Sequence, residues 1–264
     1  MSLSSFVRRA GTSWRALQEH GGGSFPGSWS IVVGNEAADS DSICSALVFA
    51  YAKSLRSEGE TSVLPVISCQ QRDLRLRREA VCLLEDFFQG DGNGEEAGLQ
   101  DLVFLDDLVA QVPFLQTLAA GGRLTITLVD HNELTGPLSD AGLGSCVTEI
   151  LDHHADVGSH AQVKGELRCI SFDPAARKGV GSTCTLVAER LFAEEKEAQA
   201  RAAAGEVSTA SCFMTPGLAQ LLLGVIILDT SCLSTRANKA SLQDHAIAAL
   251  LHTVVGGPTA LSLE

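Results

Sequence analysis

The chain has 264 residues, of which 45% are hydrophobic and 19% are charged, and this composition is that of an ordinary soluble globular protein. Its length is sufficient for one large domain or two small ones with a substantial core. The formal net charge of −13 argues against broad electrostatic attachment to nucleic acid or to an anionic membrane, and no apolar run approaches the ~20 residues that a membrane-spanning helix needs.

Residues 2–20 are predicted to form a short amphipathic helix, in which Phe6, Trp14 and Leu17 stand among arginines. The segment is also rich in Arg and Ser and nearly free of acidic residues, as transit peptides are. We favour a helix that belongs to the mature protein and is followed by a hinge at Gly21-Gly22-Gly23. Residues 1–23 are therefore expected to form a separate N-terminal piece.

From Ser30 onward, short apolar runs alternate with longer segments of helical periodicity. Strands are expected at 31–34, 63–67, 102–105, 124–129 and 147–151, and helices at 41–54 and 76–88. Strands that alternate with helices are typical of βαβ units, whose crossovers are right-handed and whose sheet is mostly parallel. The predicted fold is α/β, with a mostly parallel, Rossmann-like sheet of five strands flanked by helices.

After a further apolar run at 167–172 the chain is predicted to be helical, with a long helix at about 185–206. Thr215-Pro216 is typical of an N-cap followed by proline in the first turn, so 216–228 is also expected to be a helix. Asp229 would then lie at a helix C-terminus, where a carboxylate meets the unfavourable end of the dipole. A nearby cation would remove that conflict.

Four apolar segments, far apart in the sequence, each lead to carboxylate or imidazole side chains. In chain order these are Asp39 and Asp41; Asp130 and His131; Asp152, His153 and His154; and Asp229. In a parallel sheet, ligands bind outside the carboxyl ends of the strands, which is where most of these residues are predicted to lie. We therefore expect them to converge on one divalent-metal site. Asp106-Asp107, which follows the predicted strand 102–105, is interpreted only as a turn or helix cap.

Electrostatics favours a cation at such a site. At an effective dielectric constant of ~20, two like charges ~5 Å apart repel by roughly 3 kcal/mol. Four acids in one site would exceed what a marginally stable domain tolerates unless cations hold them. Aspartates with imidazoles suit Mn²⁺ or Mg²⁺, and two ions ~3.5–4 Å apart that share one carboxylate suit hydrolysis of a phosphoryl group by an activated water.

The same residues resemble a known family. Its four motifs match the segments Gly34–Ser42, Asp130–Glu133, Asp152–His154 and Leu228–Thr230. These are similar to the motifs of the DHH phosphoesterase superfamily. Asn35 in the first motif and the run 181–187 are similar to the exopolyphosphatase and Prune branch, whereas the related family-II inorganic pyrophosphatases carry histidine in place of Asn35. The resemblance extends from about Ser2 to Thr230.

The resemblance implies a centre with two divalent ions, Mn²⁺ or Mg²⁺. Asp39 would bind the first ion and Asp41 the second. Asp130 would bridge the two and belong to the catalytic group. His153 and Asp229 would complete the coordination of the second ion.

The resemblance also implies substrate contacts. His154 would contact phosphate, and Asn35 would stand beside the first ion as a neutral ligand or a holder of water, so both are expected to take part in catalysis. His131 would contact phosphate or support a ligand. Arg77 matches a position that reaches phosphate in the family, and its plain alternative is a solvated helix charge. Ser182 would start a helix whose N-terminus faces the site.

Family members of the polyphosphatase type carry a second, C-terminal lobe that closes over the site with Lys and Arg. Here residues 24–240 are expected to form the DHH catalytic lobe, and 241–264 a C-terminal helix and the start of a linker, at Gly256-Gly257-Pro258, to a lobe that this chain lacks. Without basic residues on the departing phosphate, the rate is expected to fall by orders of magnitude.

The leading hypothesis is a metal-dependent hydrolase of phosphoanhydride bonds, similar to exopolyphosphatases, that releases phosphate from inorganic polyphosphate by a metal-activated water. The first alternative is a Prune-like phosphodiesterase acting on cyclic nucleotides. The second is a non-catalytic metal-binding module, with a protein partner or a dimer left open. A nuclease is disfavoured by the acidic balance and by the lack of a basic, aromatic-bearing groove.

The eight cysteines are dispersed, with no C-x-x-C pair, and most lie inside apolar stretches. Free thiols in a reducing compartment are therefore expected, rather than disulfides or a zinc site. The cytoplasm is the predicted location, with mitochondria as the alternative that the N-terminal segment leaves open.

Overall fold

The computed structural model describes residues 2–19, 27–57, 61–90, 97–176, 178–204 and 214–256. By its packing the chain divides into two compact units, Met1–Gly179 and Val180–Glu264, which are described separately below. The expected hinge at 21–23 and the linker residues 257–258 lie outside the described residues. The expected domain bounds at 23 and 240 remain predictions.

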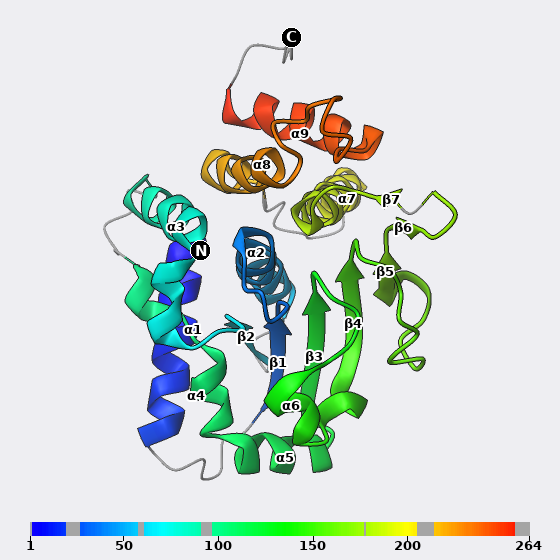
Figure 1. Ribbon diagram of the computed structural model, residues 1–264. Coiled ribbons are helices and arrows are strands. Elements are labelled where there is room, and N and C mark those ends of the chain that lie inside the picture. Colours follow the sequence, from blue (N-terminus) through cyan, green and yellow to red (C-terminus); the bar gives the residue numbers. More distant parts are fainter. Residues whose placement is uncertain are drawn as a thin grey trace. The chain divides into compact units, whose positions relative to one another are not determined.

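The first unit is built on a parallel sheet of five strands in the order β2-β1-β3-β4-β5 (Figure 1). The strands are β1 (Ser28–Val33), β2 (Thr61–Val66), β3 (Leu124–Val129), β4 (Val147–Asp152) and β5 (Arg168–Ile170). The last residue of β1, Val33, pairs with Val66 at the end of β2 and with Leu128 near the end of β3. The predicted α/β fold with a parallel five-stranded sheet is confirmed, and the carboxyl ends of its central strands lie level.

The prediction of a strand at 102–105 is wrong. Only an isolated bridge between Ile67 and Phe104 forms there, and the chain enters helix α4 (Leu105–Val109) at once. The backbone amide of Phe104 donates to Asp107 Oδ2 at 2.9 Å, which caps this helix. The apolar run favoured a strand, but the cap ends it after one bridge, as the turn or cap interpretation of Asp106-Asp107 implies. The fifth strand is instead β5, inside the apolar run 167–172.

The N-terminal helix is part of the first unit's core. α1 (Leu3–Glu19) packs on β2 and on α2 (Ser40–Arg56). The ring of Trp14 meets that of Trp29 in β1 edge-on, with centroids 5.5 Å apart, and the ring of Phe6 contacts that of Tyr51 of α2 at a tilt of 51°. Burial of aromatic rings of this size is a large share of a small core's stabilisation, so the helix expected at 2–20 is confirmed as a structural element of the described protein.

The remaining elements of the first unit are short. They are α3 (Arg78–Gly90), α5 (Val112–Ala120), α6 (Gly136–Asp140), the 3₁₀ helices η1 (Gln71–Leu76), η2 (Leu99–Asp101), η3 (Leu143–Cys146) and η4 (Gly165–Leu167), and an antiparallel pair of β6 (Phe172–Asp173) with β7 (Lys178–Gly179). The helix predicted at 76–88 corresponds to α3, which begins two residues later because η1 ends at Leu76.

The second unit consists, in its described part, of three helices that pack on one another: α7 (Thr183–Ala203), α8 (Pro216–Asp229) and α9 (Leu242–Val255). Each begins at a hydroxyl N-cap, in which Ser182, Thr215 or Ser241 accepts a backbone hydrogen bond. The helices predicted after residue 180 are confirmed, and Asp229 is the last residue of α8, as expected. Across the described ranges, every helix is too short or too polar to cross a membrane.

Candidate metal centre

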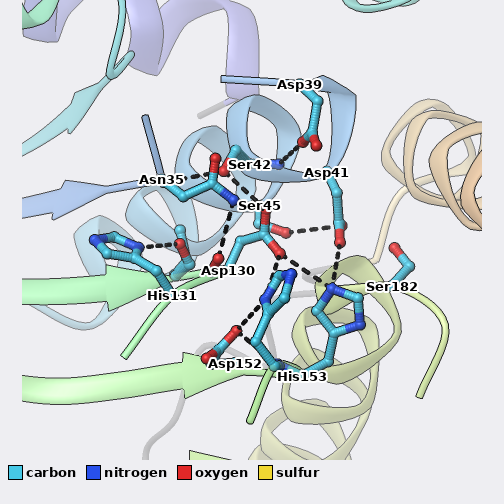
Figure 2. A network of polar contacts seen from close by, with 12 residues as sticks. Asn35, Asp39, Asp41, Ser42, Ser45, Asp130, His131, Asp152, His153 and Ser182 are labelled. Carbon is cyan, nitrogen blue, oxygen red and sulfur yellow. Dashed lines mark hydrogen bonds and ion pairs between the residues drawn. The ribbon is translucent and has the colours of Figure 1, made fainter. Parts of the chain in front are cut away.

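The candidate site lies at the carboxyl edge of the sheet in the first unit (Figure 2). The loop after β1 carries Asn35 and leads into α2, β3 ends directly before Asp130, and β4 ends in Asp152 ahead of His153. Parallel strands present their carboxyl ends at one edge, so residues that are far apart in sequence meet there. The edge predicted from the strand pattern is the edge that the structure uses.

Asp130 is the buried carboxylate at the middle of this edge. Its relative exposure is 2% and its φ is 64°, in the left-handed region that non-glycine residues rarely adopt. Its Oδ2 accepts hydrogen bonds of 2.8 Å from Asn35 Nδ2 and of 2.8 Å from Ser42 Oγ. Such backbone strain persists where the surroundings hold the residue, and it is concentrated at functional sites.

His153 lies beside Asp130, and Asp41 lies beside the same imidazole nitrogen of His153. His153 Nε2 lies 3.2 Å from Asp130 Oδ1 and 3.7 Å from Oδ2 of Asp41, which is also buried. Neighbouring ligands of an octahedral ion bound at about 2.1 Å lie about 3 Å apart. The separation of Asp130 Oδ1 from His153 Nε2 is therefore that of neighbouring ligands of one divalent cation, and Asp41 lies next to the same imidazole nitrogen.

His154 lies beside this cluster but has a different hydrogen-bond partner. Its Nδ1 is 3.8 Å from Asp130 Oδ1, close enough for Asp130, His153 and His154 to form a possible metal-binding group. However, the same nitrogen is 2.9 Å from Asp152 Oδ1, and a carboxylate only accepts, so Nδ1 carries the proton. This hydrogen bond raises the pKa of His154. The ring is half-exposed, and with the proton on Nδ1 its Nε2 is an acceptor. The phosphate contact that the resemblance implies stays a prediction.

Asn35 uses both ends of its amide inside the protein. Its Nδ2 donates to the carboxylate and to the backbone oxygen of Asp130, and its Oδ1 accepts from Ala37 N at 2.9 Å and from Ala38 N at 3.3 Å. The amide thus orients Asp130 and closes the turn after β1. The role of neutral metal ligand or water holder stays a prediction, and it would compete with these bonds.

Asp39 is exposed and caps α2, since its Oδ1 accepts from Ser42 N at 3.0 Å. Among the described contacts none joins Asp39 to Asp130 or to His153, and its role as a ligand of a first ion remains a prediction. In Figure 2, Asp41 lies between Asp39 and the His153 ring. The structure therefore brings Asp41, Asp130 and His153 together more closely than it brings Asp39.

Arg77 donates hydrogen bonds to the loop that carries Asn35 and Asp39. Its guanidinium donates to Ala37 O at 2.8 and 3.1 Å and to Ala38 O at 3.1 Å. Ala38 has a φ of 47°, so this arginine stabilises a strained turn. The interpretation of Arg77 as a solvated helix charge is wrong, because these bonds occupy much of its donor fork. The phosphate contact remains a prediction.

His131 is held away from the cluster. Its Nδ1 is 2.8 Å from the carbonyl oxygen of Val129, and in Figure 2 its ring points away from that of His153. Burial lowers the pKa of His131, so the ring is neutral near pH 7 with its proton on Nδ1. The predicted contact with phosphate is untested, and it would have to come from Nε2 as an acceptor or after protonation.

Two predicted residues belong to the second unit. Ser182 is the fully buried N-cap of α7, where its Oγ accepts from Cys184 N at 3.2 Å. Asp229 ends α8. Their expected approach to Asp130 is a relation between the two units, and it stays a prediction.

Sequence reasoning missed the role of Ser42. This residue is 1% exposed, donates to Asp130 and accepts from Asn35 N at 2.9 Å, so it joins α2 to two loops of the site. The only sequence signal was its place in the first motif, where a serine near a helix start is typical of a cap. A cap interpretation hides a contact with a residue 88 positions away.

Together the parallel sheet and the carboxylate–imidazole cluster at its carboxyl edge define an α/β lobe with a candidate divalent-metal centre. The model of the DHH family, N-terminal domain, matches residues 29–215, and the chain belongs to this family.

Several curated relatives are similar to most of this chain. Exopolyphosphatase PRUNE1 of Rattus norvegicus is 33% identical over 218 residues, which is 81% of this chain and 39% of that protein. The Homo sapiens protein of the same name is 31% identical over 217 residues, and a putative exopolyphosphatase of Schizosaccharomyces pombe is 34% identical over 203 residues, 45% of its length. The chain thus spans less than half the length of these relatives.

Among solved structures, the match to an exopolyphosphatase-related protein from Bacteroides fragilis covers 92% of this chain and 57% of the Bacteroides chain. The TM-score is 0.47 and the sequence identity is 13%. At this level of similarity the match adds nothing to what the strand order already shows.

Proposed function

We propose that this chain carries the metal centre of an exopolyphosphatase-like phosphohydrolase, which releases phosphate from inorganic polyphosphate and depends on Mn²⁺ or Mg²⁺. The observation that supports it most directly is the separation of 3.2 Å between Asp130 Oδ1 and His153 Nε2. The same nitrogen of His153 lies 3.7 Å from Asp41 Oδ2. Membership of the DHH family and similarity to exopolyphosphatases make phosphoester or phosphoanhydride hydrolysis the reaction class.

The protein's own residues would hold the ions and orient the substrate. Asp41, Asp130 and His153 are the proposed ligands of one ion, and Asp39 and Asp229 would complete a set for two. A bound divalent cation supplies charge that polarises a phosphoryl oxygen and lowers the pKa of a coordinated water. Asn35 and Ser42 hold Oδ2 of Asp130, which turns Oδ1 toward His153.

A polyanionic substrate requires a local positive field in a chain whose net charge is −13. The bound cations would provide it. His154, whose Nδ1 donates to Asp152, would present Nε2 as an acceptor to a protonated oxygen of the phosphate. Neither nucleic acid nor membrane is part of the proposal. The proposed location is the cytoplasm, as expected from the dispersed cysteines.

The test is release of inorganic phosphate from tripolyphosphate and from longer polyphosphates, with Mn²⁺, with Mg²⁺ and after treatment with EDTA. We expect release that needs the metal and is lost in D130A. Because the relatives are more than twice as long as their matched parts, a longer chain is assayed in parallel if the gene encodes one. No metal-dependent release from any chain length by either protein would contradict the proposal.

Two other outcomes would redirect it. Turnover of a cyclic nucleotide in place of polyphosphate, measured side by side, would favour the phosphodiesterase alternative. Tight binding of Mn²⁺ without turnover of either substrate would favour a non-catalytic module that uses the centre for folding or for a protein partner.

A further inference from the structure

Asp152, the first residue of the Asp152-His153-His154 motif, is fully buried and both of its oxygens accept hydrogen bonds. Oδ1 accepts from His153 N at 2.8 Å, from His154 N at 3.2 Å and from His154 Nδ1 at 2.9 Å. Oδ2 accepts from Asn132 Nδ2 at 2.5 Å. Asp152 is thus an acceptor inside the protein that sets the orientation of the two histidines.

Asn132 links the loop after β3 to the loop after β4. Its side chain is buried, and besides its bond to Asp152 its Nδ2 donates to Ala155 O at 3.0 Å, while its Oδ1 accepts from Val157 N at 2.9 Å. Neither loop has regular secondary structure at these positions. One amide therefore joins the segment that presents Asp130 to the segment that presents His153 and His154.

The orientation of the Asp152 carboxylate depends on this amide. The donors on Oδ1 come from the neighbouring residues of the motif, whereas the described donor on Oδ2 comes from Asn132, 20 residues away. A buried carboxylate oxygen that loses its partner is left desolvated without compensation, which favours its turning toward another donor. Turning Asp152 would withdraw Oδ1 from His154 Nδ1.

We propose that Asn132, acting through Asp152, is a positioning residue that keeps the His154 imidazole in the tautomer protonated at Nδ1, with the unprotonated Nε2 presented as a hydrogen-bond acceptor to a protonated oxygen (P–OH) of a substrate phosphate. The chain of hydrogen bonds stands on the geometry alone, and only the contact of Nε2 with phosphate rests on the proposed function.

Three substitutions separate orientation from charge. N132D replaces the amide donor by a carboxylate that faces Asp152, so the link is lost. D152N places an amide donor against Asn132 Nδ2 or against the backbone amides of the motif. The exchange N132D/D152N restores a donor–acceptor pair between the two positions and keeps an oxygen for His154 Nδ1, but it moves the negative charge away from the ring.

Ser159 offers a matched control. Its Oγ donates to Glu133 Oε1 at 2.9 Å, so it joins the same two loops, but the contact is exposed and does not reach Asp152. S159A is therefore expected to behave as the unaltered protein in every measurement below.

The first measurement is ¹⁵N NMR of the imidazole rings at alkaline pH, with the His154 signals assigned by comparison with H154Q. We expect the Nδ1-protonated tautomer in the unaltered protein, a mixture in N132D and in D152N, and recovery in the exchange. The Nε2-protonated tautomer in the unaltered protein would overturn the proposal without any variant.

The second measurement is hydrolysis of tripolyphosphate. Loss of the hydrogen bond between His154 and the substrate phosphate should raise KM about tenfold or more in N132D. The exchange N132D/D152N should recover part of that loss. The control S159A should have the KM of the unaltered protein. We expect kcat to change less than KM, because the contact is made in the ground state as well as the transition state.

A merely structural role would lower the melting temperature of N132D while leaving the His154 tautomer and KM unchanged, and that result would overturn the proposal. If N132D does not fold, the same NMR and KM measurements are made on the milder variant N132S, with the same expected results. Absence of polyphosphate turnover in the unaltered protein would count against the proposed function alone, because the NMR comparison still decides whether Asn132 positions His154.

Discussion

At the scale of single residues, the close approach of the loop after β1 to α2 depends on Gly34. A Cβ at this position would lie 2.8 Å from the backbone oxygen of Ser42 and 2.9 Å from its Oγ. That Oγ is also the donor to Asp130 Oδ2. The glycine thus allows the serine to reach the central carboxylate, and steric fit at this point is coupled to the geometry of the site.

We therefore expect G34A to lower the free energy of unfolding by about 1–3 kcal/mol and to weaken Mn²⁺ binding. Urea denaturation and calorimetric titration would measure the two effects. G144A is the control, since a Cβ there would meet only the ring of His160, at an ordinary 3.7 Å. An unaltered stability and affinity in G34A would show that α2 can retreat without disturbing Asp130.

The loop after β4 is anchored by one ion pair. Arg168 Nη2 lies 2.5 Å from Asp156 Oδ1, and Arg168 Nη1 donates to Ser159 O at 2.9 Å. The hydrogen bond from Arg168 holds the pKa of Asp156 below its ordinary value. A carboxyl with a lower pKa in the folded state stabilises the fold above its unfolded pKa of about 3.9, and this contribution is lost as the pH falls through the folded value.

D156N should therefore melt at a lower temperature than the unaltered protein at pH 7, and the difference should shrink as the pH is lowered below about 4. Thermal melts across that range would check it. D140N, at an exposed acid of α6 outside the described ion pairs, serves as the control. A difference for D156N that stays constant with pH would show that the ion pair is not its source.

At the scale of elements, α2 is attached to the sheet by a charged group as well as by apolar packing. Lys53 Nζ lies 2.6 Å from Glu149 Oε2 and 3.0 Å from Thr127 Oγ1. The side chains of Lys53 and Glu149 are 21% and 10% exposed. This contact joins the helix that begins at Asp39 and Asp41 to the two strands that lead to Asp130 and Asp152.

Removal of one partner from a buried ion pair leaves the other charge without compensation. We expect K53M to lower the free energy of unfolding by about 3 kcal/mol, and the double variant K53M/E149L to recover much of that loss because no charge remains buried. Denaturation by urea would measure both. Equal stability of K53M and the unaltered protein would mean that solvent replaces the lysine.

The error in the strand prediction also belongs to this scale. The run 102–105 is entirely apolar, whereas 168–170 begins with Arg168, so strand propensity favours the segment that does not form a strand. What separates them is pairing: Phe104 makes one bridge before the Asp107 cap starts a helix, whereas Arg168 to Ile170 pair with three residues of β4. Strand membership is decided by the available neighbour.

At the scale of the whole molecule, the cluster at the sheet edge concentrates negative charge that a cation would offset. A ligand that binds only the folded state raises stability by RT ln(1 + [L]/Kd), about 2.7 kcal/mol at a hundredfold excess over Kd. We expect Mn²⁺ to raise the melting temperature of the unaltered protein and to have little effect on D130N, with D140N responding as the unaltered protein does. An equal response of D130N would place the binding elsewhere.

Much of this protein follows from residue patterns along the chain. The alternation of apolar runs and helical segments determines the α/β class, and hydroxyl caps such as Thr215 mark where helices begin, because both depend on neighbouring residues. Strand ends followed by acids and imidazoles indicated the edge at which Asp41, Asp130 and His153 meet.

Tertiary structure alone decided which atoms of these residues face one another. The bonds of Asn35 to Asp130, across 95 residues, and of Asn132 to Asp152, across 20, orient each carboxylate, and no local pattern encodes them. Hydrogen-bond geometry depends on fractions of an ångström and on the packing of several distant segments at once. For this reason the sequence indicated that Asp41, Asp130 and His153 lie at one edge, whereas only the fold distinguishes Asp130, which faces His153, from Asp152, whose oxygens are used to orient His154.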